Sequence, residues 1–251
     1  MARRRPHEPP SGPARAYGQA AGVSSRLSVV VPALDEALHL GATLAALAPA
    51  RARGAEVLVV DGGSSDETVA FARPLADRVL HSPRGRAVQL NAGAAAARGE
   101  ILLFLHADSI VPPAFDRAIE AAVAGHAWAW GRFDVRIDGG PRVLALVARM
   151  MNLRSRLTGI ATGDQALFAT RALFERAGRF PVQALMEDIA FCRHAKRIAA
   201  PIRLRETVLT SGRRWARHGV VRTILLMWRL RLAYFLGADP ARLAARYRDV
   251  R

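Results

Sequence analysis

Four acidic side chains follow short apolar segments in the first half of the chain. They are Asp35 and Glu36 after residues 28–31, Asp61 after residues 57–60, and Asp108 after residues 101–105. Carboxylates at such positions can accept hydrogen bonds from a base or ribose, or hold Mg²⁺ or Mn²⁺ together with substrate phosphates. One of them alone is better explained as a helix cap or turn residue, Asp61 before Gly62-Gly63 in particular. Their shared placement favours a site.

The apolar spacing predicts the elements that bring these carboxylates together. We expect strands at 28–31 (ended by Pro32), 57–60, 78–81 and 101–105, and helices at 38–47, from Ser64 with Glu67 completing a capping box, and at 89–98. Apolar strands that alternate with helices are typical of a mainly parallel sheet covered on both faces. Ligands of such sheets bind beyond the C-terminal strand ends, where the four carboxylates lie.

The pattern is less regular beyond residue 110. We expect a helix after Pro112-Pro113, strands at 128–137, 165–169 and 202–209, and helices at 143–153 and 187–198. A long helix at 212–236 and one or two helical turns within 237–250 would end the chain. The sequence shows no internal repeat.

Composition and charge set the domain organisation. The 251 residues are 51% hydrophobic and 23% charged, which is ordinary for a globular domain. The net charge of +16 lies at the two ends: residues 1–26 carry +4, residues 27–192 are neutral, and residues 193–251 carry +12. We therefore expect a disordered basic tail at 1–25, a folded domain at 26–210 and a basic helical segment at 211–251. A basic segment on a neutral domain fits anionic membrane or phosphate contacts at least as well as nucleic acid.

Two segments bear on where the protein works. The Arg-rich start lacks the apolar stretch of a signal peptide, and Cys192 is the only cysteine, so a reducing, cytoplasmic setting is expected. Residues 219–236 are apolar but contain Arg222, Arg229 and Arg231, and each charge at a bilayer centre costs about 2.5–3.5 kcal/mol. An amphipathic helix is expected there, packed on the domain or, as the less favoured alternative, lying at a membrane surface.

Several familiar catalytic motifs are absent from the sequence. No Gly-x-Gly-x-x-Gly follows the first strand, and no Walker-type phosphate loop or nucleophile elbow occurs. The single cysteine also excludes a zinc site made of cysteines. These absences disfavour a dinucleotide oxidoreductase, a P-loop NTPase and a serine hydrolase.

Three ordered motifs resemble the signatures of family-2 glycosyltransferases. They are Ser-Val-Val-Val-Pro-Ala-Leu-Asp-Glu at 28–36, Val-Val-Asp-Gly-Gly-Ser-Ser-Asp-Glu-Thr at 59–68, and Gly-Glu-Ile-Leu-Leu-Phe-Leu-His-Ala-Asp at 99–108. The resemblance covers about residues 27–210. It implies the GT-A fold, an α/β Rossmann-like arrangement with a mixed, mainly parallel sheet and helices on both faces, followed here by C-terminal helices. The Leu-His-Ala-Asp variant, Gly85-Arg-Ala-x-Gln-x-Asn91 and Arg213-Arg-Trp215 are similar to a bacterial subgroup of radical-SAM/selenodomain-associated transferases.

The resemblance implies a nucleotide site and a metal ligand. The turn residues Pro32, Ala33 and Glu36 would cradle the nucleoside, with Asp61 facing the base and Arg86 near the base or diphosphate. His106 and Asp108 occupy the family's Asp-x-Asp motif, whose last acid binds Mn²⁺ or Mg²⁺. His106 replaces the first acid, and a structural role at the strand end is as good a reading for it as ligation.

The resemblance also implies acceptor-side residues. Asp164 lies in Gly-Asp-Gln, and Glu187-Asp188 matches the pair whose Asp is the catalytic base. From the residues alone, this pair is better explained as a helix start. Arg214 and Trp215 are similar to part of the Gln-x-x-Arg-Trp motif of processive synthases, but the Gln is missing and a solvated helix start is an equal reading. For Trp128 and Trp130, core packing is favoured over sugar stacking.

The sequence thus predicts an inverting, metal-assisted glycosyltransferase. It would move a sugar, in the manner of a hexosyltransferase, from a nucleoside-diphosphate sugar, with uridine as the expected base, to a hydroxyl of a lipid, metabolite or peptide. Asp108 would hold the metal and Asp188 would act as the base. The alternatives are a nucleotidyltransferase, which would want a Gly-rich, Lys-containing loop after the first strand, and a non-catalytic protein that binds anionic lipid or RNA through its basic segment. No nucleic-acid partner is expected, and peripheral contact with the inner face of a membrane is a further possibility.

Overall fold

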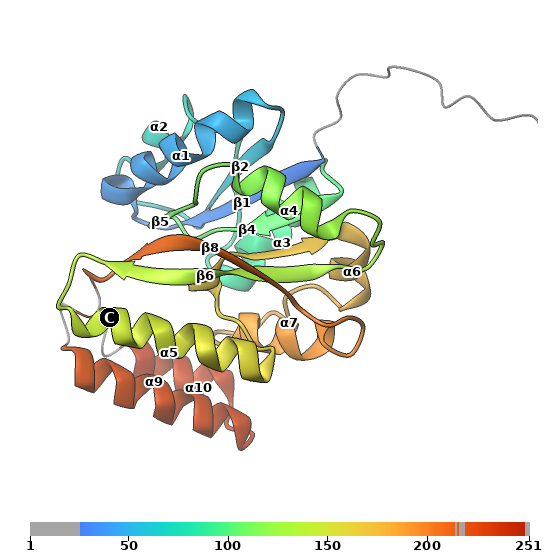
Figure 1. Ribbon diagram of the computed structural model, residues 1–251. Helices are drawn as coiled ribbons and strands as arrows, with labels where there is room; N and C mark the ends of the chain where they lie inside the picture. The colour runs from blue at the N-terminus through green and yellow to red at the C-terminus, as the bar shows by residue number, and fades with distance from the viewer. Residues whose placement is uncertain (1–25, 214, 216–218, 249–251) are drawn as a thin grey trace, which may run out of the picture.

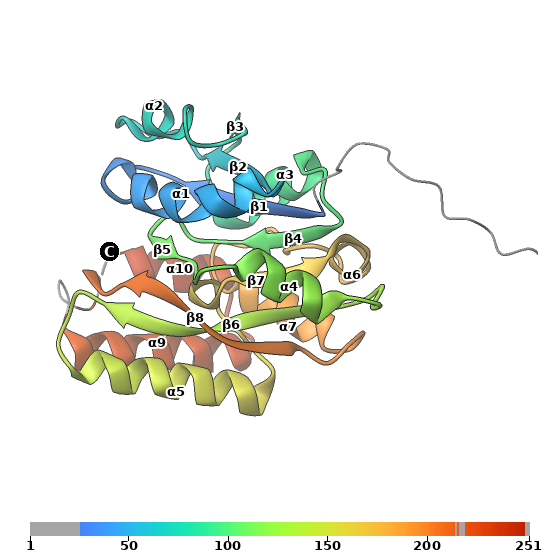
Figure 2. The ribbon, with the colours of Figure 1, turned by 45° about the horizontal axis from the view of Figure 1, so that its top comes forward.

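The computed structural model describes residues 26–213, 215 and 219–248, so the expected tail at 1–25 lies outside it. Within these residues, one sheet of eight strands runs through the molecule in the order β3-β2-β1-β4-β7-β6-β8-β5 (Figures 1 and 2). Four of its seven strand pairings are parallel. The expected mixed, mainly parallel sheet with helices on both faces is therefore confirmed.

The first half of the sheet is parallel and alternates with helices. Its elements are β1 (Leu27–Ala33), α1 (Ala37–Ala52), β2 (Glu56–Asp61), α2 (Thr68–Ala72), β3 (Arg78–His81), α3 (Arg86–Ala96) and β4 (Ile101–Phe104). Every residue of β2 and β4 is buried, as expected for continuous apolar strands between two helical layers. Gln89 of α3 donates to the carbonyls of Ala33 and Val60, which fixes the carboxyl ends of β1 and β2 relative to α3.

The second half of the sheet mixes strand directions, because β7 enters antiparallel between β4 and β6. The pairing of β6 with β8 shifts register between Phe133 and Asp134, where β8 contains two extra residues, Arg205 and Glu206. The elements are β5 (Ser109–Ile110), α4 (Phe115–Val123), β6 (Trp130–Asp138), α5 (Val143–Thr158), the short 3₁₀ helix η1 (Gly163–Gln165), β7 (Leu167–Thr170), α6 (Arg171–Arg176), α7 (Glu187–Ala195), β8 (Ile202–Ser211), α9 (Val220–Phe235) and α10 (Pro240–Arg248).

Alternate residues of each central strand fill two separate cores. Val29 and Val31 of β1 pack with α1 and α4 on one face, and Val30 packs with α3, α6 and α7 on the other. Aromatic rings strengthen the second core, where Phe104 contacts Phe174 and Phe180 with ring centroids 5.0 and 4.8 Å apart. These cores hold the carboxyl ends of β1, β2 and β4 in fixed positions.

The C-terminal helices pack against the domain rather than standing apart from it. Leu230 of α9 and Leu243 of α10 are buried with Met186, the residue before α7. Val220 and Ile224 of α9 pack beside buried residues of α5. The helices α5 and α9 therefore lie side by side beneath the sheet, as both views show (Figures 1 and 2). Within the described ranges, no helix has both the length and the hydropathy needed to cross a bilayer.

Several expected boundaries were wrong. The helix expected from Ser64 begins at Thr68 without a side-chain cap, because the Ser64 hydroxyl bonds to the carboxylate of Asp61 instead. Pro32 does not end the first strand: β1 continues to Ala33, and the pairing with β4 has already ended at Val30. The helix expected at 212–236 is not continuous: Arg213 and Trp215 are helical, Gly219 is not, α9 begins at Val220, and residues 214 and 216–218 lie outside the description. The short elements β5, η1 and α6 were not expected.

Candidate active site

A large cleft lies at the carboxyl ends of β1 and β4. Its volume is about 1480 Å³, and it extends from the turn after β1 across to α5, α9 and α10. The residues around it include most of those expected from the sequence. On the β1 and β4 side they are Pro32, Ala33, Asp35, Glu36, Arg86, His106 and Asp108, and on the far side they are Asp164, Glu187, Arg213 and Trp215.

Two carboxylates and one arginine meet at the strand ends. Nη2 of Arg213, which follows β8, lies 2.7 Å from Glu36 Oε1 and 3.3 Å from Asp108 Oδ2. The carboxylates belong to the turns after β1 and β4, so residues far apart in the chain meet here because their strands are neighbours. Arg213 supplies positive charge where the two acids would otherwise repel each other. The arrangement is a ready place for a cation or for the phosphates that a cation accompanies.

The carboxylate of Asp61 is committed to its own turn. It accepts hydrogen bonds from the backbone N–H groups of Gly63 and Ser64, from the Ser64 hydroxyl at 2.5 Å, and it lies 3.2 Å from His81 Nδ1. Burial works toward a higher pKa, but the hydrogen bonds from Ser64, Gly63 and His81 hold the pKa of Asp61 below its ordinary value. Asp61 is 2% exposed and is not among the described residues that line the cleft. Its role toward a base stays a prediction.

His106 connects the two sides of the cleft. Its Nδ1 lies 3.2 Å from Asp164 Oδ1 on η1, and its side chain is mostly buried. Gly163 packs directly against the imidazole, so closely that a Cβ at this position would collide with Nε2. The close approach of the His106 ring thus leaves room only for glycine at position 163. This contact places η1 against the loop that carries Asp108.

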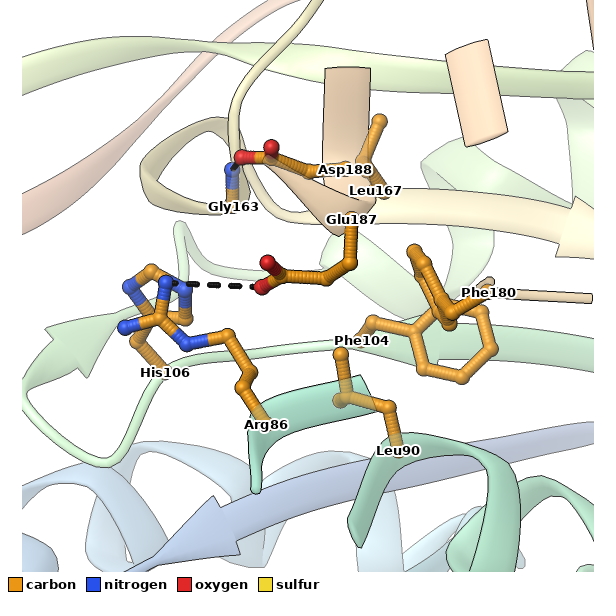
Figure 3. A pocket seen from close by; sticks show the side chains of 9 residues that line it. All are labelled: Arg86, Leu90, Phe104, His106, Gly163, Leu167, Phe180, Glu187 and Asp188. Atoms are coloured by element: carbon orange, nitrogen blue, oxygen red, sulfur yellow. Dashed lines mark hydrogen bonds and ion pairs between the residues drawn. The ribbon is translucent and has the colours of Figure 1, made fainter. Parts of the chain in front are cut away.

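A second, inner group of charges lies behind the cleft at the start of α7 (Figure 3). Glu187 and Asp188 are its first two residues, and Glu187 Oε1 lies 3.7 Å from Nη1 of Arg86, the first residue of α3. They surround a cavity of about 10 Å³, roughly the room of one water molecule. Glu187 lines both this cavity and the large cleft, whereas Asp188 lines only the inner cavity.

The protein holds Asp188 in an environment that favours its protonated form. Its Oδ2 accepts from the Gly163 N–H at 2.8 Å and its Oδ1 from the Ile189 N–H at 2.7 Å. Burial and, after it, the charge of Glu187 raise the pKa of Asp188 to about 6, although the hydrogen bond from Gly163 and the charge of Arg86 work the other way. A carboxylate with such a pKa is a competent general base near neutral pH.

Arg86 balances this acidic group. Burial works toward a lower pKa, yet the charges of Glu187, Asp188 and Asp164 outweigh it and raise the pKa of the Arg86 guanidinium above its ordinary value. Arg86 therefore remains charged in the inner cavity, at the point where this cavity meets the cleft. The placement suits an anionic group that enters from the cleft.

The donor atoms at the strand ends fit a divalent cation held jointly with a ligand. Asp108 and Glu36 offer carboxylate oxygens that already attract the Arg213 guanidinium. No set of three or more His, Cys, Asp or Glu in the described ranges is arranged to hold a metal alone. Mg²⁺ and Mn²⁺ commonly use one or two carboxylates together with phosphate oxygens and water. The residues fit such a shared site.

The remaining aromatic and motif residues divide into two groups. Trp215 lines the cleft, while Arg214 lies outside the described residues. Trp130 is fully buried and donates to the Ala199 carbonyl, and Trp128 lies under the guanidinium of Arg176 at 4.6 Å from the ring centre. The core packing favoured from the sequence is therefore confirmed for Trp130 and wrong for Trp128, which is half exposed and stacks with Arg176 at the surface.

Three arginines of the cleft, Arg84, Arg154 and Arg231, were missed as site residues by the sequence analysis. Arg154 of α5 and Arg231 of α9 line the cleft, and Nε of both and Nη2 of Arg154 are buried without a hydrogen-bond partner in the structure. Burial lowers the pKa of Arg154, partly offset by the charges of Asp188 and Asp164. Arg231 was noticed only as a charge that argues against a membrane span. The sequence held a partial signal for Arg154 and Arg231. Arg154 lies four residues after Met150, and Arg231 lies three residues after Trp228, so each shares a helix face with a residue that also lines the cleft.

Comparison with known proteins places the chain in a family. The sequence model of glycosyl transferase family 2 matches residues 28–173, whereas no curated protein sequence matches. Among solved structures, the chain is similar to S. aureus TarS 1-349 (TM-score 0.58, 20% identity, covering 75% of this chain and 61% of that one). It is also similar to glucosyl-3-phosphoglycerate synthase from Mycobacterium tuberculosis in complex with Mn²⁺, UDP and phosphoglyceric acid (TM-score 0.58, 22% identity, covering 86% and 80%).

These structures share the fold, and the chain spans less than two thirds of the TarS fragment. The family match carries more weight, since it covers over half of the sequence and all three motifs that follow β1, β2 and β4. It confirms the resemblance that the motifs indicated, at the level of the family and the GT-A fold. The chain belongs to glycosyl transferase family 2.

Proposed function

We propose that the protein transfers a sugar from a uridine-diphosphate sugar to an acceptor hydroxyl, with inversion at the anomeric carbon and with the help of a divalent cation. One observation carries this proposal. The cleft holds a cation-attracting pair of carboxylates, Glu36 and Asp108, and reaches Glu187, which also lines the inner cavity where Asp188, with its pKa raised to about 6, lies. The first group suits a diphosphate and its metal, and the second suits a base.

The donor would bind on the β1 and β4 side. Pro32, Ala33 and Glu36 form the turn that would hold the nucleoside, and Asp108 would hold the cation. When bound, the cation supplies charge that stabilises the departing diphosphate. Arg213, already directed at these carboxylates, would turn to the phosphate oxygens once the cation takes its place. Arg86 would approach the same diphosphate from the start of α3.

The acceptor would be activated on the opposite side. Its hydroxyl oxygen attacks the anomeric carbon, the bond from that carbon to the diphosphate oxygen breaks, and the hydroxyl proton passes to Asp188. Attack from the face opposite the leaving group inverts the configuration. The two backbone N–H groups of Gly163 and Ile189 fix the carboxylate of Asp188 in place, which is what a positioned base needs. Asp164, Glu187, Arg214 and Trp215 are proposed to surround the acceptor.

Structures of the same fold support the donor class. TarS 1-349 has been solved in complex with UDP-GlcNAc and with UDP, and the mycobacterial synthase with UDP and Mn²⁺. Those ligands belong to those proteins. They support a uridine nucleotide and a divalent cation here, because the matching strand ends of this chain carry Asp108 and Glu36. We further propose residues 26–210 as the catalytic unit and residues 211–251 as an addition that completes the acceptor side.

Calorimetric titration with a panel of nucleoside diphosphates, with and without Mn²⁺, tests the proposal. We expect Mn²⁺-dependent binding of UDP to the wild type and its loss in Asp108→Ala. Glu175→Ala is the matched control, because Glu175 is an exposed acid of α6 that is paired with Arg179, just beyond the helix, and it is not among the residues that line the cleft. Failure of the folded wild type to bind any nucleotide would contradict the proposal.

A further inference from the structure

Two neighbouring helices expose apolar stripes instead of polar ones. Residues at helical spacing on α5 and α9 are more than half exposed although they are large and hydrophobic: Leu146, Met150, Leu153 and Leu157 on α5, and Val221, Leu225, Trp228, Leu232 and Phe235 on α9. On the solvent-exposed side of a surface helix, charged and polar residues are the norm. Exposed apolar patches of this extent mark an interaction surface.

The two stripes lie on the same side of the molecule. At 100° per residue, each stripe is about a quarter turn away from the side where its helix packs on the other. On α5 the packing side carries Val147 and Met151, and on α9 it carries Val220 and Ile224. The helices lie side by side beneath the sheet (Figure 2), and because the residues of both stripes are exposed, both stripes face away from it. We call these two stripes together the α5–α9 face.

Positive charge borders this face on both outer edges. Arg149 and Arg156 lie beside the α5 stripe, and Arg222 and Arg229 lie beside the α9 stripe. All four are exposed, and Arg156 is also paired with Asp134. The helices α5, α9 and α10 together contain nine arginines and no acidic residue. Apolar side chains flanked by arginines, with a tryptophan and a phenylalanine among them, are typical of helices that lie in the interface of an anionic membrane.

The cleft opens onto this face. Met150 and Trp228 belong to the two stripes and also line the cleft. Just inside, between the two helices, lie Arg154 and Arg231 with buried N–H groups that lack a partner in the structure. A buried N–H group of a guanidinium without a hydrogen-bond partner is costly, and a phosphate oxygen is an acceptor that matches it well. The route from the face to Glu187 therefore passes two arginines suited to an anionic group.

We propose that the α5–α9 face lies on an anionic lipid surface and that the acceptor is a lipid whose phosphate is bound by Arg154 and Arg231 as it enters the cleft. The second half of this statement rests on the proposed function, and the first does not. A second copy of the chain suits the face less well, because it would bring arginine-bordered stripes of like charge together. A bilayer supplies both the apolar layer and the negative charge.

Vesicle co-sedimentation of the full chain tests the surface. We expect binding to vesicles that contain phosphatidylglycerol with phosphatidylcholine, and much weaker binding to phosphatidylcholine alone. Phe235→Ser should weaken binding about tenfold, since it removes one apolar side chain from the interface. Phe71→Ser is the matched control, because Phe71 is a half-exposed phenylalanine of α2 on the far side of the sheet and should leave binding unchanged. Circular dichroism confirms that both variants are folded.

Binding of a soluble alkyl phosphate, decyl phosphate, below its micelle concentration tests the cleft. We expect calorimetric binding to the wild type, a loss of at least tenfold in Arg154→Gln/Arg231→Gln, and no comparable binding of inorganic phosphate. Equal binding of inorganic phosphate would replace the lipid with a small anionic acceptor and overturn the lipid assignment.

Other results would overturn the surface proposal. One is equal sedimentation of wild type and Phe235→Ser with anionic vesicles, and another is a dimer in light scattering that Phe235→Ser dissociates. Failure of the proposed function shows itself differently, as absent UDP binding in a protein that still binds vesicles. Absent vesicle binding in a protein that binds UDP rejects only the surface.

Discussion

Replacing Asp188 by Asn separates two consequences of its environment, one for stability and one for catalysis. The side chain is held by the N–H groups of Gly163 and Ile189, and its pKa is raised from 3.8 to about 6, chiefly by burial and then by the charge of Glu187. A raised carboxyl pKa means that the fold favours the protonated form. The stability that this preference contributes is present below the pKa of the unfolded chain and is lost as pH rises through the pKa of the folded state. An amide does not titrate and has no such dependence.

The magnitude follows from the size of the shift. About two pKa units correspond to roughly 3 kcal/mol of free energy of unfolding, lost by the wild type between about pH 4 and pH 6. From about pH 4.5 to about pH 7.5, the stability of Asp188→Asn relative to the wild type should therefore rise by about 2 kcal/mol. The amide also loses one backbone hydrogen bond, about 1 kcal/mol, but this offset is nearly the same at both pH values.

Urea unfolding at these two pH values measures the difference. Asp116→Asn is the control of opposite sign: the hydrogen bond and charge of Arg53 hold the pKa of Asp116 below its ordinary value even against the effect of burial. Its stabilising contribution is present above the pKa of the unfolded chain and is lost only below about pH 4, so Asp116→Asn should be less stable than the wild type by nearly the same amount at both pH values. A stability difference for Asp188→Asn that stays flat or falls with rising pH would refute the reasoning.

The same variant tests the catalytic role. If Asp188 accepts the proton of the acceptor, its loss should lower the transfer rate by about 10²–10⁴-fold while nucleotide binding is largely kept. The pH–rate profile of the wild type should fall on the acid side near pH 6, where the carboxylate becomes protonated. Parallel loss of transfer and nucleotide binding would instead make Asp188 a structural residue of the donor site.

Three further predictions concern the neighbours of this carboxylate. Glu187→Gln removes a negative charge that raises the pKa of Asp188, so the acid limb of the pH–rate profile should move to lower pH; an unmoved limb would contradict this coupling. Gly163→Ala places a Cβ against the His106 imidazole and should destabilise the protein by about 1–3 kcal/mol in urea unfolding and lower the transfer rate; wild-type values for both would show that the contact gives way freely. Arg213→Gln removes the guanidinium that now pairs with Glu36 and Asp108, so Mn²⁺ should bind these carboxylates roughly two- to fivefold more tightly in the absence of nucleotide. Electron paramagnetic resonance measures this binding. Weaker binding would mean that the carboxylates do not hold the metal.

The fold of residues 27–104 could be predicted because each of its strands and helices is marked by the apolar spacing of its own segment. Continuous apolar segments, each followed by an acid or glycine and then a helix, become strands β1, β2 and β4 of a parallel sheet, and this topology brings Glu36 and Asp108 together. The capping box at Ser64 failed because the hydroxyl found a stronger local partner in Asp61. The Ser64 hydroxyl can either cap a helix or bond to Asp61, and the sequence alone does not show which of these two contacts forms.

The acceptor half could not be predicted to the same degree, because packing between distant helices creates it. In the sequence Arg154 looks like one more exposed arginine, but in the structure, where α9 packs beside α5, Nε and Nη2 of its guanidinium are buried. Likewise, the inner cavity forms only where the start of α7 meets the start of α3, about a hundred residues apart in sequence. The roles of Asp164, Trp215 and the other acceptor-side residues, and the cytoplasmic setting, stay predictions.

The central claim is that this cleft transfers a sugar with inversion, using Asp188 as the base. Proton NMR of the wild type with a panel of nucleoside-diphosphate sugars and Mn²⁺ tests it most directly, because slow transfer to water reports the configuration of the released sugar without a known acceptor. The account predicts release of UDP together with a sugar of inverted anomeric configuration, and no release by Asp188→Asn. A sugar released with retained configuration, or turnover that survives in Asp188→Asn, would contradict it.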